Sequence, residues 1–194
     1  MSGGLDQLAA RMRACRVCEA HLPLGPRPIF RLSASARLLI IGQAPGTRVH
    51  ESGIPWDDRS GDRLRQWLDL DRETFYDVSR VAILPTGLCY PGRLPGGGDR
   101  PPRPECAPLW HPPALAELSG ARLILLVGSY AQAYHLGEAR KATLTDTVAA
   151  WRDYLPHFLV LPHPSWRTTA WESRNPWFGG ELLPRGREMV AGLL

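Results

Sequence analysis

Leu38-Leu39-Ile40-Ile41-Gly42-Gln43-Ala44-Pro45-Gly46 is the stretch of sequence that decides the fold. Its first four residues form a short apolar run of the kind that makes a buried parallel strand. Glycine and proline then end the strand, because neither continues a regular element there. A polar loop runs on to Asp62, after which apolar residues recur at helical spacing. A buried strand, a long loop and a helix form the layout in which open α/β sheets bind ligands.

Three further apolar runs are typical of buried strands, and they lie at residues 81–84, 122–127 and 158–161. Segments with helical spacing lie at residues 5–18, 63–70, 113–118, 131–136, 143–154 and 182–193, with a short capped turn at 71–76. Strands that alternate with helices predict an α/β protein, a three-layer α/β/α sandwich with a central four-stranded parallel sheet. The length of 194 residues suits one core, so we expect a single domain over residues 1–194.

The charge of the chain is modest, and its basic side chains are almost all arginines. The formal net charge is +4, and Lys141 is the only lysine among 23 basic residues. The planar guanidinium suits phosphates and bases, so the charge permits nucleic-acid binding, although a GC-rich genome also explains the shortage of lysine. No apolar run is long enough to span a membrane, and the amino terminus lacks a secretory signal. We therefore expect a cytoplasmic protein without a membrane partner.

The four cysteines fall into two pairs. Cys15 and Cys18 form a C-x-x-C motif, whereas Cys89 and Cys106 flank a loop rich in proline, glycine and arginine. Disulfides are disfavoured in the cytoplasm, so we expect the four thiols to bind a metal centre that clips this loop to the amino-terminal segment. Unrelated buried thiols are the alternative. Four thiolates suit both zinc and an iron–sulfur cluster.

Polar residues follow the carboxyl end of each predicted strand, at residues 42–62, 85–89, 128–130 and 163–167. Because the carboxyl ends of parallel strands meet at one edge of the sheet, we expect these segments to form a functional site. The first of them contains His50, Glu51, Asp57 and Asp58 beside an aromatic residue. The arginines of the later loop, at positions 93, 100 and 103, are candidates for phosphate contacts, or simply solvated.

Two motifs resemble signatures of the uracil-DNA glycosylase superfamily. Gly42-Gln43-Ala44-Pro45-Gly46, followed by Gly53-Ile54-Pro55-Trp56, resembles the first signature, and His163-Pro164-Ser165 resembles the second. The cysteine pairs around a proline-rich loop resemble the iron–sulfur branch of that superfamily. This resemblance implies a [4Fe-4S] cluster, with structural zinc as the alternative. The implied ligands are Cys15, Cys18, Cys89 and Cys106.

The resemblance implies a DNA repair enzyme that hydrolyses the bond between a damaged or deaminated base and deoxyribose. Such an enzyme flips the nucleotide out of the duplex, at a cost of a few kcal/mol. His163 matches the histidine that donates to the base carbonyl, and Trp56 matches the aromatic platform for the base. Ser165, Trp166 and Arg167 fall where the family inserts a loop into the minor groove, so that Trp166 would fill the vacated stack. The alternative for His163 is a capping or core histidine. The alternative for Trp56 is a core tryptophan, and that for Trp166 is a surface tryptophan.

The sequence departs from the family at both familiar acids. Gln43 stands where the iron–sulfur branch has glutamate, and Ala44 stands where other uracil enzymes have aspartate. Asp58 matches an aspartate that precedes a similar Arg-Ser-Gly-Asp run in another branch. We therefore expect Asp58 to position the attacking water, with His50 and Glu51 as rivals, while helix capping is the competing interpretation of Asp58.

The specificity of the enzyme is expected to be broad. The family's base-reading asparagine falls near Pro85 and Thr86, and neither side chain carries an amide. Xanthine, hypoxanthine and other deaminated bases therefore join uracil as candidate substrates. Lys141 is the only lysine and is predicted on the helix side of the sheet, so a monofunctional reaction that uses water is favoured over attack by an amine.

Two other functions stay open. A catalytically silent member of the same fold would bind damaged or single-stranded DNA through its arginines and aromatics. A metal-dependent hydrolase would need an open site with histidine and carboxylate ligands, whereas four cysteines make a closed centre. With either DNA-binding interpretation we expect a monomer that acts on DNA at the prokaryotic nucleoid.

Overall fold

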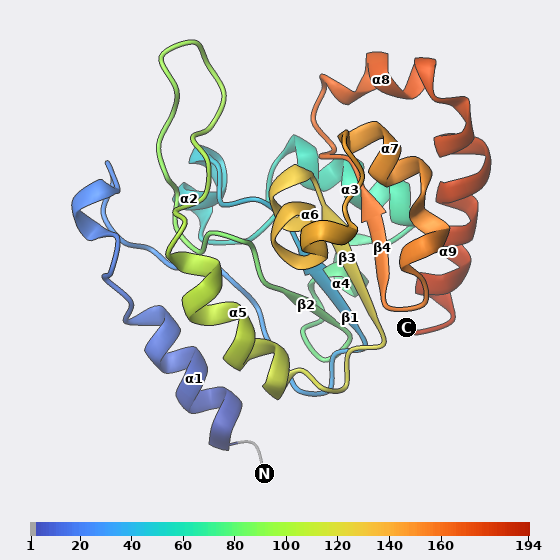
Figure 1. The fold of residues 1–194 in the computed structure, drawn as a ribbon. Coiled ribbons are helices and arrows are strands. Elements are labelled where there is room, and N and C mark those ends of the chain that lie inside the picture. The colour runs from blue at the N-terminus through green and yellow to red at the C-terminus, as the bar shows by residue number, and fades with distance from the viewer. Residues whose placement is uncertain (1–2) are drawn as a thin grey trace.

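The computed structural model describes residues 3–194 and places a four-stranded parallel sheet at the centre of the molecule (Figure 1). β1 (Leu38–Ile41) pairs with β2 (Val81–Ile83) on one side and with β3 (Leu123–Val127) on the other. β4 (Phe158–Leu161) pairs with β3, so the strand order is β2-β1-β3-β4. All three pairings are parallel, which confirms the predicted sheet.

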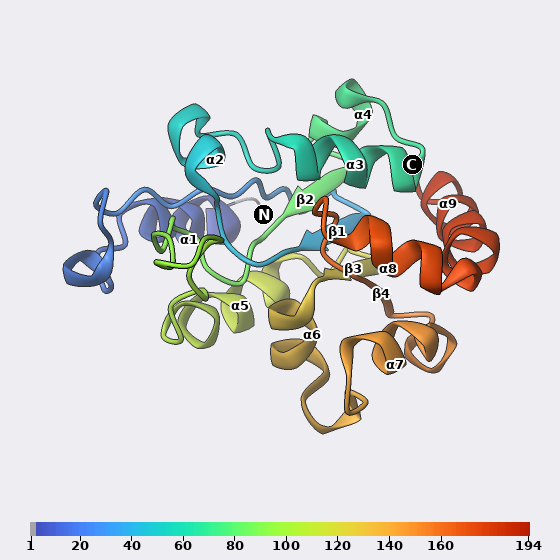
Figure 2. The same cartoon turned by 90° about the horizontal axis from the view of Figure 1, so that it is seen from above.

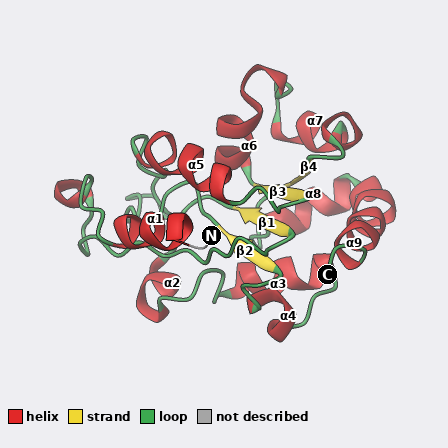
Figure 3. Ribbon diagram, turned by 90° about the horizontal axis from the view of Figure 1, so that it is seen from below, coloured by secondary structure: helices red, strands yellow, loops and turns green. Residues whose placement is uncertain are grey.

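Helices cover both faces of the sheet, as the two end-on views show (Figures 2 and 3). The helices on one face are α2 (Thr47–Ser52), α3 (Arg59–Leu68) and α4 (Arg72–Tyr76), and those on the other are α5 (Cys106–Glu117), α6 (Ser129–Leu136) and α7 (Leu144–Ala149). α1 (Gly3–Arg13) packs against α5, α9 (Leu183–Ala191) packs against α3, and α8 (Thr168–Arg174) follows β4. Single turns lie at Glu19–His21, Gly137–Ala139, Trp151–Tyr154 and Phe178–Leu182. The three layers are those that the sequence predicts.

Burial explains why β1 is uniformly apolar. Every side chain from Leu38 to Ile41 is 0% exposed, because helices lie over both faces of the strand. Each such side chain contributes about 1.5–3 kcal/mol when it leaves water. A strand that is buried on both faces has no polar side, so its sequence shows a continuous run instead of an alternating pattern.

The pairing of β1 with β2 continues past the ends of both strands. The amide of Leu84 donates to the carbonyl of Ile40 at 3.0 Å, and the amide of Thr86 donates to that of Gly42 at 2.9 Å. The amide of Gly87 donates to the carbonyl of Gln43 at 2.8 Å. The glycine-proline loop after β1 is therefore fixed to the segment after β2 by backbone hydrogen bonds, which places both at the same edge of the sheet.

Two helices begin at least four residues earlier than the sequence predicts. α3 begins at Arg59 instead of residue 63, because the side chain of Asp58 accepts a hydrogen bond from the amide of Gly61 and caps the helix. α5 begins at Cys106 instead of Pro113 and contains two prolines in its interior. Proline disfavours a helix interior, but burial of Trp110 and Ala114 in the core outweighs that local preference.

The remaining differences concern short elements. The predicted helix 5–18 ends at Arg13, so the first cysteine pair follows the helix. The predicted helix 143–154 is divided into α7 and a single turn. α2 and α8 are absent from the prediction, because six or seven residues are too few to show helical periodicity. The predicted capped turn at 71–76 is confirmed as α4, and Asp71 accepts from the amide of Thr74 at 2.6 Å.

Residues 1–2 of the predicted single domain lie outside the described part of the chain, and the domain assignment stays a prediction. Among the helices that the structure describes, none is long and apolar enough to cross a membrane.

The central position of β1 predicts a large cost for truncating its side chains. Ile40→Ala should lower the free energy of unfolding by about 2–5 kcal/mol, because the buried site collapses only in part. Leu109→Ala is the matched control, since Leu109 lies on α5 and is 43% exposed, and it should change stability by less than about 0.5 kcal/mol. Urea unfolding followed by circular dichroism measures both values. Equal losses in the two variants would contradict the assignment of β1 as the centre of the core.

Candidate functional site

A cavity opens beyond the carboxyl ends of β1, β2 and β4, and eight residues that the sequence predicts for the site line it. These are Gly42, Gln43, Ala44, Pro45, Gly46, Trp56, Asp58 and His163. Side chains from segments far apart in the chain therefore meet at one edge of the sheet, as parallel strands require. The seven further lining residues are Ile29, Val49, Pro55, Ser60, Ile83, Pro85 and Asp99.

A second cavity adjoins the first and brings in the rest of the predicted DNA-binding loop. Ser165, Trp166 and Arg167 line it together with the loop that carries Arg93 and Leu94. The two cavities share Gln43, Ala44, Ser60, Asp99 and His163. We call the first cavity the inner cavity and the second the outer cavity. Together they form one continuous depression.

Trp56 is held over the loop that follows β1 in a conformation that tryptophan rarely adopts. Its φ is +59°, in the left-handed region. A Cβ atom at position 42 would lie 2.6 Å from Cζ2 of this ring, and one at position 61 would lie 1.7 Å from the Trp56 carbonyl oxygen. Only glycine therefore fits at Gly42 and Gly61. A strained backbone that is fixed in this way is a feature of functional sites.

His163 lies next to this tryptophan and is kept neutral by its surroundings. The ring centroids of Trp56 and His163 are 5.8 Å apart. Burial lowers the pKa of His163, while the nearby charge of Asp58 acts in the opposite direction. The backbone here is fixed by Ser165, whose amide donates to the His163 carbonyl at 2.8 Å, and by Thr168. A neutral imidazole carries one N–H donor, which suits an oxygen that becomes negative during a reaction.

Asp58 has two roles in the structure. Its Oδ1 accepts the amide of Gly61 at 2.8 Å and caps α3, and the same side chain lines the inner cavity. Helix capping is thus compatible with the predicted place of this carboxylate in the site. The neighbouring Asp57 pairs with Arg72 at 2.8 Å, and this guanidinium lowers the pKa of the Asp57 carboxyl.

The two predicted rivals of Asp58 lie outside the inner cavity. His50 and Glu51 belong to α2, and Arg27 donates to the backbone carbonyls of both. Burial lowers the pKa of His50, and Arg27 lowers it further. The side chain of Glu51 is in an exposed position. The geometry therefore favours Asp58 over both rivals.

Pro85 and Thr86 differ in what they present to the cavity. Pro85 lines it, whereas the buried Thr86 hydroxyl donates to the Gly42 carbonyl at 2.7 Å. Thr86 thus holds the loop after β1 in place, and its hydroxyl is already used. Neither residue supplies a side-chain amide to the cavity.

Asp99 is a carboxylate of the cavities that the sequence analysis missed. It lines both cavities and belongs to a loop rich in glycine and proline, which shows no periodicity. Partial loss of solvent raises the pKa of Asp99; Arg93 acts against this shift and Asp58 adds to it. The only sequence signal is a lone carboxylate in the segment Gly96-Gly97-Gly98-Asp99, and such a signal gives no spatial position.

All four cysteines line a single cavity, and none of them forms a disulfide. The amide of Leu88 donates to Sγ of Cys106 at 3.3 Å. Burial raises the pKa of the Cys89 thiol to about 11 and that of Cys106 to about 12. Within residues 3–194, no three histidine, cysteine or acidic side chains stand in an arrangement that already holds a metal ion. Four thiols around one cavity are the donor set of a four-sulfur centre.

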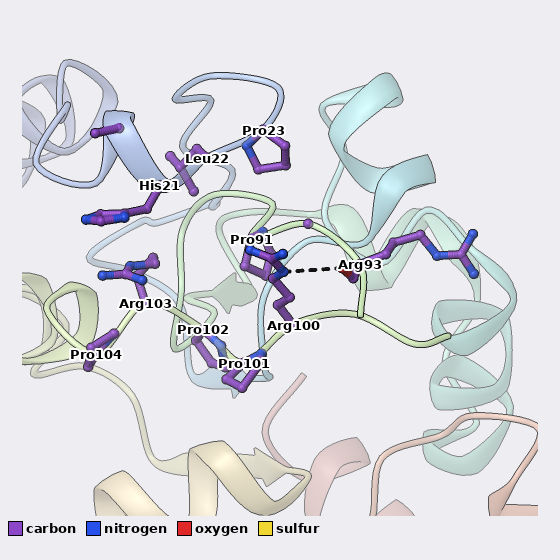
Figure 4. Close-up of a pocket in the computed structure, with 12 residues that line it drawn as sticks. His21, Leu22, Pro23, Pro91, Arg93, Arg100, Pro101, Pro102, Arg103 and Pro104 are labelled. Carbon is purple, nitrogen blue, oxygen red and sulfur yellow. Dashed lines mark hydrogen bonds between the residues drawn. The ribbon is translucent and has the colours of Figure 1, made fainter. Parts of the chain in front are cut away.

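The three predicted phosphate-binding arginines line one groove of about 540 Å³ (Figure 4). Arg100 Nε donates to the carbonyl of Arg93 at 3.2 Å, which is the dashed line in the figure. Arg103 forms an ion pair with Glu105 at 2.8 Å. His21 also lines the groove, next to Arg103 in Figure 4, and prolines make up much of the rest. Arg93 also lines the second cavity, so basic side chains continue from the site into this groove.

A comparison with protein-family models gives one match. The model described as the uracil DNA glycosylase superfamily matches residues 30–185. This range contains every residue that lines the two cavities except Ile29, together with Cys89 and Cys106, and leaves out the first cysteine pair.

The charge around His163 predicts how it titrates. The pKa of His163 should lie below its usual 6.5, so the ring is neutral at neutral pH. Asp58→Asn should lower this pKa further, because the negative charge that favours the protonated ring is removed. Asp153→Asn, at an exposed position of the Trp151–Tyr154 turn, should leave it unchanged. Nitrogen-15 NMR of the ring nitrogens measures each titration, and a His163 that is protonated at neutral pH would contradict the described site.

Proposed function

This chain belongs to the uracil-DNA glycosylase superfamily, and we propose that it hydrolyses the N-glycosidic bond of a flipped-out uracil or other deaminated base in DNA. The proposed reaction is monofunctional and uses water. One observation carries the proposal: His163, Trp56 and Asp58 line the same cavity at the carboxyl edge of the sheet. A hydrogen-bond donor, an aromatic face and a carboxylate are what this hydrolysis needs.

In this proposal His163 acts on the leaving base. When the glycosidic bond breaks, its electron pair moves onto the base and negative charge grows on a base carbonyl oxygen. The neutral ring of His163 donates its N–H to that oxygen and stabilises the charge. Trp56, whose ring lies beside His163, holds the flipped base by stacking.

Asp58 acts on the sugar and the water. The deoxyribose becomes positively charged as the base departs, and a carboxylate close to it lowers the energy of that state. Oδ1 of Asp58 is held by the amide of Gly61, so the carboxylate is fixed before the substrate arrives. A fixed charge needs no reorganisation during the reaction, which is the source of its effect.

The outer cavity supplies the contacts to DNA in this proposal. Trp166 is 78% exposed, and the Arg167 guanidinium lies 5.5 Å above its ring. A large aromatic side chain in water suits a wedge that enters the base stack when a nucleotide leaves it. Arg93 and Arg100 in the adjoining groove suit the phosphates of the same strand.

The substrate range proposed here includes xanthine and hypoxanthine beside uracil. The part of the cavity that would read the base presents Pro85, which has no polar side chain, and the hydroxyl of Thr86 is already bonded. Recognition then depends on shape, stacking and the backbone of residues 42–46. Such a pocket discriminates weakly between bases that share a carbonyl group.

For the four cysteines we propose a [4Fe-4S] cluster, with structural zinc as the alternative. The chemistry of the donors supports this, because four thiols around one cavity match either centre and no disulfide competes for them. The amide of Leu88 would donate to one ligating sulfur. The centre would be structural: it would tie the loop between Cys89 and Cys106 to the segment that follows α1.

The main prediction concerns base release. Under single-turnover conditions, the wild-type protein should release the base from an oligonucleotide that carries uracil, xanthine or hypoxanthine. His163→Ala should slow release about 10²–10³-fold, because one donor to the developing charge is lost. Asp58→Asn should also slow release, while α3 stays capped because asparagine is a good N-cap residue.

The matched control for this experiment is His157→Ala, since His157 is exposed before β4 and away from the cavity. It should release base at the wild-type rate. DNA affinity should be similar in all four proteins. Tight binding by the wild-type protein without release of any base would contradict the proposal and favour the silent DNA-binding alternative.

The metal centre has its own prediction. Protein purified without oxygen should be brown, with iron and acid-labile sulfide that fall together in Cys106→Ser, because one of four ligands is weakened. The same variant should lose thermal stability, since the loop after Cys89 is no longer tied. Elemental analysis and visible absorption are the measurements. A colourless protein that contains zinc would establish the alternative, and a protein without either metal would contradict both.

A further inference from the structure

We propose that Asp99 is a second catalytic carboxylate of this site, the group that accepts the proton of the attacking water. The inference rests on the proposed function and adds to it a residue outside both recognisable motifs. Asp99 lines the inner cavity and the outer one, so it lies where the base-binding and DNA-binding parts of the depression meet.

A short hairpin presents Asp99 to the cavity. Arg93 and Asp99 form an antiparallel bridge, and the amide of Leu94 donates to the carbonyl of Gly98 at 3.0 Å. This hairpin is the tall green loop of Figure 1. At its base, the amide of Arg100 donates to the carbonyl of Gly92 at 2.8 Å. Asp99 is therefore held between two backbone hydrogen bonds of the hairpin, one to the Gly98 carbonyl and one from the Arg100 amide.

The hairpin is also tied to the loop that follows β1. Gln43 Nε2 donates to the carbonyl of Arg100 at 3.4 Å. A Cβ atom at position 46 would lie 3.2 Å from Oδ2 of Asp99, so the carboxylate rests against the backbone of Gly46. These two contacts place Asp99 beside the loop that follows β1. In that loop Gln43 offers an amide and no carboxylate.

The other polar side chains of the inner cavity are poorer proton acceptors. An amide such as that of Gln43 does not take up a proton at ordinary pH. Asp58 has one oxygen engaged by the amide of Gly61. Among the residues that line the inner cavity, Asp58 and Asp99 are the carboxylates. Asp99 has no comparable capping role, and it is accessible to solvent, from which the reacting water comes.

The surroundings of Asp99 favour a proton acceptor, mainly because the carboxyl is partly removed from solvent. Partial loss of solvent raises the pKa of Asp99, the charge of Asp58 on α3 raises it as well, and Arg93 of the hairpin opposes both. His163 faces it from the segment after β4. Arg167 also approaches, because its Nη1 lies 3.7 Å from where a Cβ of residue 98 would stand. A carboxylate with a raised proton affinity is a better general base near neutral pH.

The reaction step then balances with the groups present. The oxygen of water forms a bond to C1′ of the deoxyribose while the bond between C1′ and the base nitrogen breaks. The electron pair of that bond leaves with the base, whose carbonyl oxygen accepts a hydrogen bond from the N–H of His163. The proton that the water loses moves to the carboxylate of Asp99, and Asp58 stabilises the positive sugar in between. The base anion then takes up a proton from solvent and Asp99 returns its proton to solvent, so the products are the free base and an abasic site.

The test compares wild type, Asp99→Asn and Gly96→Ala in single-turnover base release over a pH series, on the lesion that the wild type releases fastest. In the wild type the rate should rise with pH as Asp99 loses its proton and then level off. Asp99→Asn should be about 100-fold slower or worse and should lose this rise. Gly96→Ala is the control in the same hairpin, because a Cβ there meets nothing within 4 Å, and it should keep both rate and profile.

A second variant separates chemistry from structure. Asp99→Ala leaves space for a small carboxylate, so added formate should restore part of its rate without changing its affinity for DNA. Rescue of this kind is not expected where a side chain only supports the fold. Thermal melting and DNA affinity of both Asp99 variants should match the wild type.

The outcomes distinguish this inference from the proposed function. A wild type that releases base, beside an Asp99→Asn variant with the same rate and pH profile, would overturn the role of Asp99 alone. Loss of release together with loss of DNA affinity or thermal stability, and no rescue by formate, would make Asp99 structural and overturn its catalytic role. A wild type that releases no base from any lesion would overturn the proposed function and this inference together.

Discussion

The parallel pairing of β1 with β2 is the interaction on which the rest of the site depends. It continues past the strands, where the amides of Thr86 and Gly87 donate to the carbonyls of Gly42 and Gln43. These hydrogen bonds fix the backbone of the first motif against a buried sheet, and the Thr86 hydroxyl adds a third contact. Because a buried backbone group without a partner is costly, the loop has little freedom to move. Every group that lines the cavity is positioned relative to this fixed edge.

Several residues serve the fold and the site at once. Asp58 caps α3 and lines the cavity, and Gly61 both donates to Asp58 and leaves room for the Trp56 carbonyl. Gly42 in turn leaves room for the Trp56 ring. A substitution that alters volume at these positions changes structure and chemistry together. For this reason the informative variants are those that keep shape and hydrogen-bonding pattern, such as aspartate to asparagine at a helix cap.

Two loops from distant parts of the chain complete the depression over this edge. The hairpin with Asp99 comes from between β2 and α5, and the loop with Trp166 comes from between β4 and α8. The four cysteines lie around one cavity, and Cys89 and Cys106 flank the segment that contains this hairpin. A centre held by them would therefore restrain the same loop that carries Arg93, Asp99 and Arg100. In this arrangement the proposed metal centre acts on the reaction only by limiting the positions of that loop.

The sequence by itself determined the sheet, because buried parallel strands are continuous apolar runs, and it determined the two motifs, because they are contiguous. It also located α4 through its capping aspartate. Only the tertiary structure decided that α5 includes two prolines, since the burial of Trp110 and Ala114 is a property of the packed molecule. The same holds for Asp99, and for the exclusion of His50 and Glu51 from the inner cavity. Local sequence fixes which elements form, whereas the distance between side chains on separate loops is set by the contacts that hold those loops.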